Sequence, residues 1–277
     1  MKGLPSKPVS ELGSIEKANN FEATWNDEYT MSRPLENKRA LVTGGSRGIG
    51  AAIVKRLAAE GAHVALTYVS KPEQAQQTAK EAQTAGVRAI AIAADSADAN
   101  AVVAAVERTV SEFGGIDILV NNAGIATMAR IEDYRLEDFD RTVAANVRAV
   151  FVATQAAVKH MGSGGRVINI GSCNAERMPF AGGAVYAMSK AALVGLTKGL
   201  ARDLGPRGIT INNIQPGPVD TEMNPANSEF ADMLRKLMAL PRYGTADEIA
   251  AMVAYLAGPE AGFVTGASLT IDGGFTA

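Results

Sequence analysis

From residue 38 onward the sequence alternates between short, almost wholly apolar runs and longer segments with helical periodicity. Near-continuous apolar runs are typical of strands that are covered on both faces of a sheet. The predicted strands are residues 39–43, 63–69, 88–93, 116–120, 167–170, 209–214 and 268–271. The predicted helices are residues 48–60, 72–85, 99–113, 136–160, 184–204 and 246–256. This alternation predicts right-handed crossovers, and therefore an α/β fold with a doubly wound, seven-stranded parallel sheet and helices on both faces.

No linker or internal repeat divides residues 38–277, so we expect them to form one domain. The preceding residues 1–37 mix charged residues, Ser, Asn and Pro without a period, and they lack the apolar centre of a secretory signal. We expect a loosely ordered extension there. The alternative is a specific arm that docks through Trp25, the only tryptophan.

Composition and charge argue against several classes of partner. The net charge is −2 and no long block of like charges occurs, which disfavours nucleic acids and membrane surfaces. No apolar run reaches the ~18 residues that a membrane span needs. Cys173 is the only cysteine, so an internal disulfide is excluded, which fits a cytoplasmic protein. The two isolated histidines, His63 and His160, do not suggest a metal site.

A glycine-rich segment, TGGSRGIG at residues 43–50, joins the first predicted strand to the first predicted helix. Gly44, Gly48 and Gly50 lie where backbone N–H groups and the positive end of a helix dipole can meet a phosphate. Glycine lets the backbone turn tightly and approach a ligand closely. The segment alone is also compatible with a tight connection that binds nothing.

Other polar or glycine clusters follow the ends of later predicted strands. Because the carboxyl ends of parallel strands meet at one edge of a sheet, all these clusters are expected at the same edge. Tyr186 and Lys190 lie four residues apart and share one face of a helix. Their alternative interpretation is an ordinary amphipathic surface helix. The clusters are Asp95-Ser96, NNAG at 121–124, Ser172, YAMSK at 186–190 and PGPVDT at 216–221.

With these motifs and Asn146, the sequence resembles the short-chain dehydrogenases/reductases in their compact, classical form. The resemblance covers about residues 38–277 and includes the ending TGASLTIDGGF at 265–275. It implies a Rossmann-like fold and an activity similar to that of 3-oxoacyl-acyl-carrier-protein reductases and NADPH-dependent carbonyl reductases. It also implies a homotetramer. One departure is visible, because Ser172 and Tyr186 are further apart than is usual in that family.

The chemistry of carbonyl reduction needs a proton donor for the developing alkoxide. Tyr186 is the candidate donor, and a nearby ammonium at Lys190 is expected to lower its pKa from the free value of ~10. Ser172 is expected to hold the substrate oxygen by a hydrogen bond. The resemblance implies that Asn146 holds a water that links Lys190 to solvent, although taken alone Asn146 is compatible with an ordinary polar residue.

The absence of a carboxylate at the end of the second predicted strand favours NADP(H) over NAD, because NAD is usually selected by an acidic residue there. Tyr68 occupies that position, and Arg47, Ser70 and Lys71 are available for a 2′-phosphate. Alternatively, Arg47 is a solvent-exposed turn residue and Tyr68 stacks near adenine. The predicted cofactor-binding residues are Gly44, Ser46, Arg47, Gly48, Ile49, Gly50, Tyr68, Ser70, Lys71, Asp95, Ser96, Asn122, Ala123, Gly124, Tyr186, Lys190, Pro216, Gly217, Val219 and Thr221.

The substrate is constrained mainly by residues 224–240, which are expected to form a flap rich in methionine and leucine. An adaptable apolar wall suits a neutral, largely apolar ketone or secondary alcohol. Plain packing of the flap on the core is the simpler interpretation of most of these residues. A 3-oxoacyl thioester on acyl carrier protein or coenzyme A is the alternative substrate, and a non-catalytic NADP(H)-binding scaffold or sensor is a further alternative. Cys173 is expected to be a small buried residue.

Overall fold

The computed structural model describes residues 33–277. Most of the expected extension, including Trp25, lies outside the described residues. Pro34–Ala277 form one compact unit. Leu35, which falls within the expected extension over residues 1–37, is fully buried, and its backbone N–H donates to the carbonyl of Glu60 at 2.9 Å. The segment just before the first strand is therefore packed onto the core.

One seven-stranded sheet runs through this unit in the order β3-β2-β1-β4-β5-β6-β7. Every neighbouring pair is parallel, which confirms the predicted parallel, doubly wound sheet. The chain moves outward from β1 to β3 and then returns to β4 on the other side of β1, so the order reverses between β1 and β4. The strands are β1 Arg39–Val42, β2 His63–Tyr68, β3 Ala89–Ala93, β4 Ile118–Asn121, β5 Arg166–Ile170, β6 Thr210–Pro216 and β7 Ser268–Ile271.

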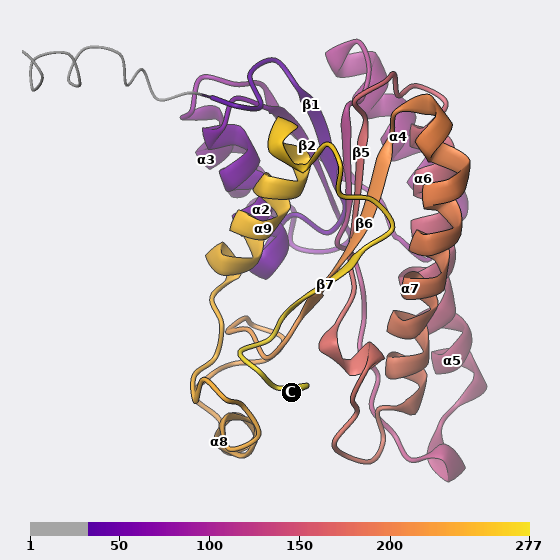
Figure 1. The fold of residues 1–277 in the computed structure, drawn as a ribbon, viewed down its shortest axis with the longest axis vertical. Coiled ribbons are helices and arrows are strands. Elements are labelled where there is room, and N and C mark those ends of the chain that lie inside the picture. Colours follow the sequence, from indigo (N-terminus) through magenta and orange to yellow (C-terminus); the bar gives the residue numbers. More distant parts are fainter. Residues whose placement is uncertain (1–32) are drawn as a thin grey trace, which may run out of the picture. The chain divides into compact units, whose positions relative to one another are not determined.

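Helices cover both faces of the sheet (Figure 1). On one face lie α2 (Gly48–Ala59), α3 (Pro72–Gln83) and α9 (Ala246–Ala257). On the other lie α4 (Ala99–Phe113), α5 (Leu136–Val143), α6 (Ala149–Ala157) and α7 (Ala184–Leu204). The short helix α8 (Glu229–Arg235) lies away from the sheet. Single 3₁₀ turns occupy Ile131–Asp133, Cys173–Ala175, Gly205–Arg207 and Pro259–Ala261. No helix among the described residues is long and apolar enough to cross a membrane.

The strands bury alternate side chains on opposite faces, as the period of two requires. In β1, Ala40 and Val42 pack into the core beneath α2 and α9, whereas Leu41 packs into the core beneath α4 and α6. Leu66 and Ala65 of β2 divide in the same way. Because both faces are covered, the strands read as continuous apolar runs rather than as alternating ones.

Side chains fix where two of the helices begin. Asp98 precedes α4 and accepts a hydrogen bond from the backbone of Asn100 at 2.8 Å. Thr245 and Glu248 form a reciprocal capping box at the start of α9. Each cap satisfies N–H groups that have no partner within the helix, and such a cap typically contributes about 1 kcal/mol.

The helix predicted over 136–160 differs from the prediction in one important respect. It is interrupted by a π-helical turn at Ala144–Arg148, closed by a hydrogen bond from Ala149 N to Ala144 O, and its α-helical part ends at Ala157. A π turn inserts one extra residue into the helical register. Periodicity alone does not reveal such an insertion, because the segments before and after it both remain helical.

Candidate active site

A cavity of about 470 Å³ opens at the carboxyl edge of the sheet, where the strand order reverses between β1 and β4. Open α/β sheets bind their ligands at this kind of position. All but two of the predicted site residues line it, the exceptions being Asn146 and Lys71. The lining residues from the prediction are Gly44, Ser46, Arg47, Gly48, Ile49, Gly50, Tyr68, Ser70, Asp95, Ser96, Asn122, Ala123, Gly124, Ser172, Tyr186, Lys190, Pro216, Gly217, Val219 and Thr221.

The glycine turn between β1 and α2 forms one end of this cavity. Gly44 and Gly48 have φ of +66° and +52°, in the left-handed region that favours glycine. A Cβ on Gly50 would lie 2.2 Å from the carbonyl oxygen of Gly44, so no side chain fits there. The side chain of Arg47, at the N-cap position, makes no capping bond to α2. The N-terminal N–H groups of this helix therefore suit an anionic ligand group such as a diphosphate.

The loop after β4 holds this glycine turn in place. The backbone N–H groups of Asn122 and Ala123 both donate to Thr43 Oγ1 at 3.0 Å. The Asn122 side chain donates to the carbonyls of Thr43 at 3.0 Å and Gly44 at 2.9 Å. Asn122 was predicted as a cofactor-binding residue, and its side-chain amide is committed to fixing the turn.

Ser172, Tyr186 and Lys190 meet at the opposite end of the cavity. Ser172 follows β5, and the other two residues lie on α7. Lys190 Nζ donates to the carbonyl of Ile170 at 2.9 Å and lies 5.8 Å from the centroid of the Tyr186 ring. Ser172 and Lys190 are almost completely buried. The arrangement places a hydroxyl, a phenol and an ammonium in one desolvated pocket.

Asn146 lies in the π turn and is buried behind this group. Its Oδ1 accepts from Ile125 N at 2.8 Å, and its Nδ2 donates to Ile125 O at 2.9 Å and Ser189 Oγ at 3.0 Å. A Cβ on Gly124 would lie 3.3 Å from both Asn146 Oδ1 and Lys190 Nζ. The glycine therefore leaves a narrow space beside these two polar atoms. The π turn therefore carries the residue that is bonded to the loop after β4.

Comparisons with known proteins agree with this geometry. The family model described as enoyl-(acyl carrier protein) reductase matches residues 44–276. A short-chain dehydrogenase/reductase of known structure from Serratia marcescens is 65% identical, with a TM-score of 0.87, over 88% of this chain and 100% of that one. The chain belongs to the short-chain dehydrogenase/reductase family. This confirms the resemblance inferred from the motifs.

Two further relatives have names that mention different nucleotides. A short-chain dehydrogenase from Burkholderia cenocepacia, solved in complex with NADP, is 58% identical with a TM-score of 0.87 over 88% of this chain and 100% of that one. The cyclic-di-GMP-binding biofilm dispersal mediator protein of Escherichia coli is 50% identical over 240 residues, which are 87% of this chain and 98% of that protein.

The pKa values within this short-chain dehydrogenase/reductase site are set mainly by burial. Burial raises the pKa of the Tyr186 phenol above 10.0, while a hydrogen bond with Ser172 acts in the opposite direction. Burial also lowers the pKa of Lys190 from 10.5 to about 8. The pKa of Tyr186 therefore moves in the opposite direction to the one expected from Lys190, because burial is the largest influence on it. Tyr186 is therefore held in its protonated form at neutral pH.

Cys173, beside Ser172, is 1% exposed, as expected for a small buried residue. Burial, followed by the nearby charge of Asp272, raises the pKa of its thiol to about 12. Because the thiolate is the nucleophilic form, burial and the raised pKa disfavour a nucleophilic role for this cysteine at neutral pH.

Sequence reasoning missed three polar residues that line the cavity. Thr67 Oγ1 accepts from Gly44 N at 3.0 Å, and a lone threonine in an apolar strand was the available signal. Arg141 pairs with Asp95 at 3.3 Å, but nothing in the helical pattern distinguishes it from other surface arginines. Glu222 contacts both Arg47 and Lys71, and only the proximity of three chain segments reveals it. Lys71 therefore touches the cavity through Glu222 rather than lining it.

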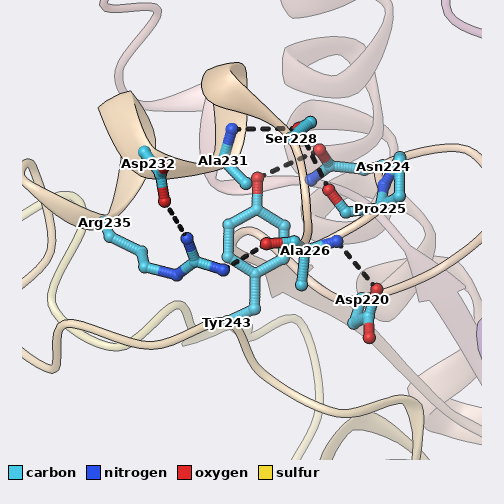
Figure 2. Close-up of polar contacts among 9 residues, drawn as sticks. All are labelled: Asp220, Asn224, Pro225, Ala226, Ser228, Ala231, Asp232, Arg235 and Tyr243. Atoms are coloured by element: carbon cyan, nitrogen blue, oxygen red, sulfur yellow. Dashed lines mark hydrogen bonds and ion pairs between the residues drawn. The ribbon is translucent and has the colours of Figure 1, made fainter.

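The expected flap over residues 224–240 contains α8 and is held by a small polar cluster (Figure 2). Tyr243 donates from its hydroxyl to Asn224 Oδ1 at 3.1 Å. The Arg235 guanidinium lies 5.4 Å from the centroid of the Tyr243 ring and donates to the carbonyl of Ala226. Ser228 caps α8 by accepting from Ala231 N at 3.1 Å. These contacts give the flap a defined conformation.

Proposed function

We propose that this protein is an NADP(H)-dependent oxidoreductase that transfers a hydride between the nicotinamide and a ketone or secondary alcohol. The observation that carries the proposal is the shape of one cavity, with a phosphate-suited glycine turn at one end and Ser172, Tyr186 and Lys190 at the other. In a dinucleotide the diphosphate likewise lies apart from the reactive ring, which is at one end of the molecule. The glycine positions that exclude a Cβ support this fit.

NADP(H) is proposed rather than NAD(H) for two reasons. The end of β2 carries Tyr68 and no carboxylate, whereas Arg47 lines the cavity close by. The Burkholderia cenocepacia relative, at 58% identity, was solved with NADP. Ser46, Ser70 and Lys71 are proposed to assist Arg47 at the 2′-phosphate.

The proposed chemistry divides between the cofactor and the chain. NADPH, when bound, supplies the hydride. Ser172 donates a hydrogen bond to the substrate oxygen and stabilises the charge that develops there. Tyr186 gives this oxygen its proton, for which its raised pKa keeps it loaded at neutral pH. Lys190, with a pKa of about 8, is largely charged at pH 7 and stabilises the phenolate that remains. Asn146 fixes the loop that borders Lys190 and is proposed to position the water through which the proton is replaced.

The proposed substrate is a neutral, largely apolar small molecule. Met223 lines the cavity, and Phe180 packs edge-on against Phe230 of the flap with ring centroids 5.3 Å apart. The flexible thioether of Met223 suits an apolar substrate body of variable shape, whereas the two phenylalanines lie outside the cavity lining. A 3-oxoacyl thioester remains the competing substrate class, and the assay below separates the two.

A non-catalytic role is the second candidate, favoured by the name of the Escherichia coli relative, a cyclic-di-GMP-binding mediator protein. Retention of Ser172, Tyr186, Lys190 and Asn146 around one cavity supports an enzyme instead. A protein that only binds a nucleotide has no need for a phenol next to a buried ammonium.

We further propose a cytoplasmic homotetramer. The single, buried and unpaired Cys173 fits a reducing compartment. Phe151 and Met188, on helices α6 and α7, are 45% and 43% exposed, which suits burial against another copy. β7 lies at an edge of the sheet and offers unpaired backbone groups.

The decisive assay measures NADPH consumption with a panel of simple ketones, β-ketoesters and 3-oxoacyl thioesters, with cyclic-di-GMP binding measured in parallel. We expect turnover of apolar ketones with NADPH and much weaker turnover with NADH. Preference for thioesters would replace the substrate proposal. Tight binding of cyclic-di-GMP with no turnover of any carbonyl would instead support the non-catalytic role.

A further inference from the structure

Three segments that are distant in the sequence meet beside the glycine turn of the cavity. Arg47 Nη1, from the glycine turn, lies 2.9 Å from Glu222 Oε2. Lys71 Nζ, from the loop after β2, lies 3.2 Å from the same oxygen. Glu222 itself belongs to the loop after β6 and lines the cavity. One carboxylate oxygen therefore joins the two cations that were predicted to bind a 2′-phosphate.

A guanidinium and an ammonium that together hold a carboxylate are also suited to hold a phosphate monoester. Hydrogen bonds from Lys71 and then Arg47 hold the pKa of Glu222 below its ordinary value, so the carboxylate stays charged at neutral pH. A bound 2′-phosphate and an ionised Glu222 cannot both occupy the same donors without mutual repulsion. The two anions are thus alternatives for one cationic pair.

On the basis of the proposed cofactor, we propose that Glu222 competes with the 2′-phosphate of NADP(H) for Arg47 and Lys71, and thereby limits the preference for NADP(H) over NAD(H). When the 2′-phosphate binds, it displaces the carboxylate from the two cations. NAD(H) carries no such phosphate and leaves both ion pairs intact. The carboxylate therefore weakens NADP(H) binding selectively.

The expected size of this effect follows from the exposure of the groups. The side chains of Arg47, Glu222 and Lys71 are 45%, 48% and 53% exposed, so solvent screens each pair. Exposed pairs of this kind are weak, and removing two of them is expected to tighten NADPH binding by about threefold to tenfold. Salt screening should reduce the effect further.

The test compares the wild-type protein with Glu222→Gln and with the control Glu137→Gln. Glu137 is also an exposed carboxylate that pairs with an arginine, Arg135, but it does not line the cavity. Dissociation constants are measured by calorimetry for NADPH, NADH, adenosine 2′,5′-bisphosphate and adenosine 5′-monophosphate. Glu222→Gln is expected to tighten the two 2′-phosphorylated ligands by about threefold to tenfold and the other two by less than about twofold. Glu137→Gln is expected to change none of them.

A second variant distinguishes competition from a merely structural role. In an Arg47→Ala background, the gain from Glu222→Gln should shrink, because one of the two contested cations is gone. Unchanged or weaker binding of NADPH by Glu222→Gln would overturn the inference while leaving the cofactor assignment intact. Equal tightening of NADPH and NADH would also overturn it. If the wild-type protein bound neither NADPH nor adenosine 2′,5′-bisphosphate, the proposed function itself would fail.

Discussion

The floor of the cavity and the flap beside it are built by different means. The floor, meaning the glycine turn and the loop after β4, is held by hydrogen bonds in which a backbone group always takes part, such as those from the N–H groups of Asn122 and Ala123 to the Thr43 hydroxyl at 3.0 Å, and it includes positions where no Cβ fits. The flap is held mainly by side-chain contacts, such as the hydrogen bond from Tyr243 to Asn224, and Met223, directly before the flap, is 60% exposed. Because its bonds involve the backbone, the floor tolerates little displacement, which suits a reaction step that is the same for every substrate. A flap held by side chains can adapt, which suits a variable substrate.

The largest effect is expected at the catalytic residues, which border the floor of the cavity. Tyr186→Phe removes only the phenolic hydroxyl and should lower kcat/KM for ketone reduction by about 10²–10⁴-fold, because the oxygen loses its proton donor. The dissociation constant for NADPH should stay within about twofold, measured by fluorescence titration of the same samples. A variant that retained its activity would show that the phenol is not the donor.

A second variant tests the rigidity of the floor at its phosphate end. Gly50→Ala forces a Cβ to within 2.2 Å of the Gly44 carbonyl and must displace the turn. We expect kcat/KM with NADPH to fall by about 10²-fold, the scale on which a displacement of about 1 Å acts. Gly162→Ala is the matched control, since its Cβ meets nothing within 4 Å. Similar kinetics for both variants would mean that the turn is as adaptable as the flap.

A third prediction concerns the buried ammonium. Because burial lowers the pKa of Lys190 from 10.5 to about 8, the unfolded chain binds more protons than the folded protein between these values. The free energy of unfolding of the wild type should therefore rise by about 2 kcal/mol relative to Lys190→Met from pH 7 to pH 9.5. Denaturant titrations of the cofactor-free proteins at these pH values measure it. A constant difference would show that Lys190 is not desolvated.

The smallest effect is expected in the flap. Tyr243→Phe removes the hydrogen bond to Asn224 and should destabilise the flap by about 1 kcal/mol. We expect the KM for ketones to rise by about twofold to fivefold with kcat nearly unchanged, since Tyr243 does not line the cavity. A loss of kcat comparable to that of Tyr186→Phe would erase the distinction between the two regions.

The sequence predicts features that depend on local backbone requirements better than features that depend on contacts between distant segments. The parallel sheet and the glycine turn are predictable, because apolar runs and glycines at fixed positions reflect local backbone requirements. The π turn around Asn146 is not, because one inserted residue leaves both flanking helical patterns intact. The contact of Glu222 with Arg47 and Lys71 depends on three loops meeting in space, which no local pattern encodes. The raised pKa of Tyr186 likewise depends on burial that only the fold defines.

Hydride transfer into a carbonyl is the central claim, and isotope transfer tests it most directly. NADPH carrying deuterium at both C4 positions is incubated with the protein and the preferred ketone from the panel, and the alcohol is examined by mass spectrometry. We predict one deuterium at the carbinol carbon of each product molecule, and labelled product formed at least about 100-fold more slowly with Tyr186→Phe. Alcohol formed without deuterium, or NADPH that binds tightly while no carbonyl is reduced, would contradict the account.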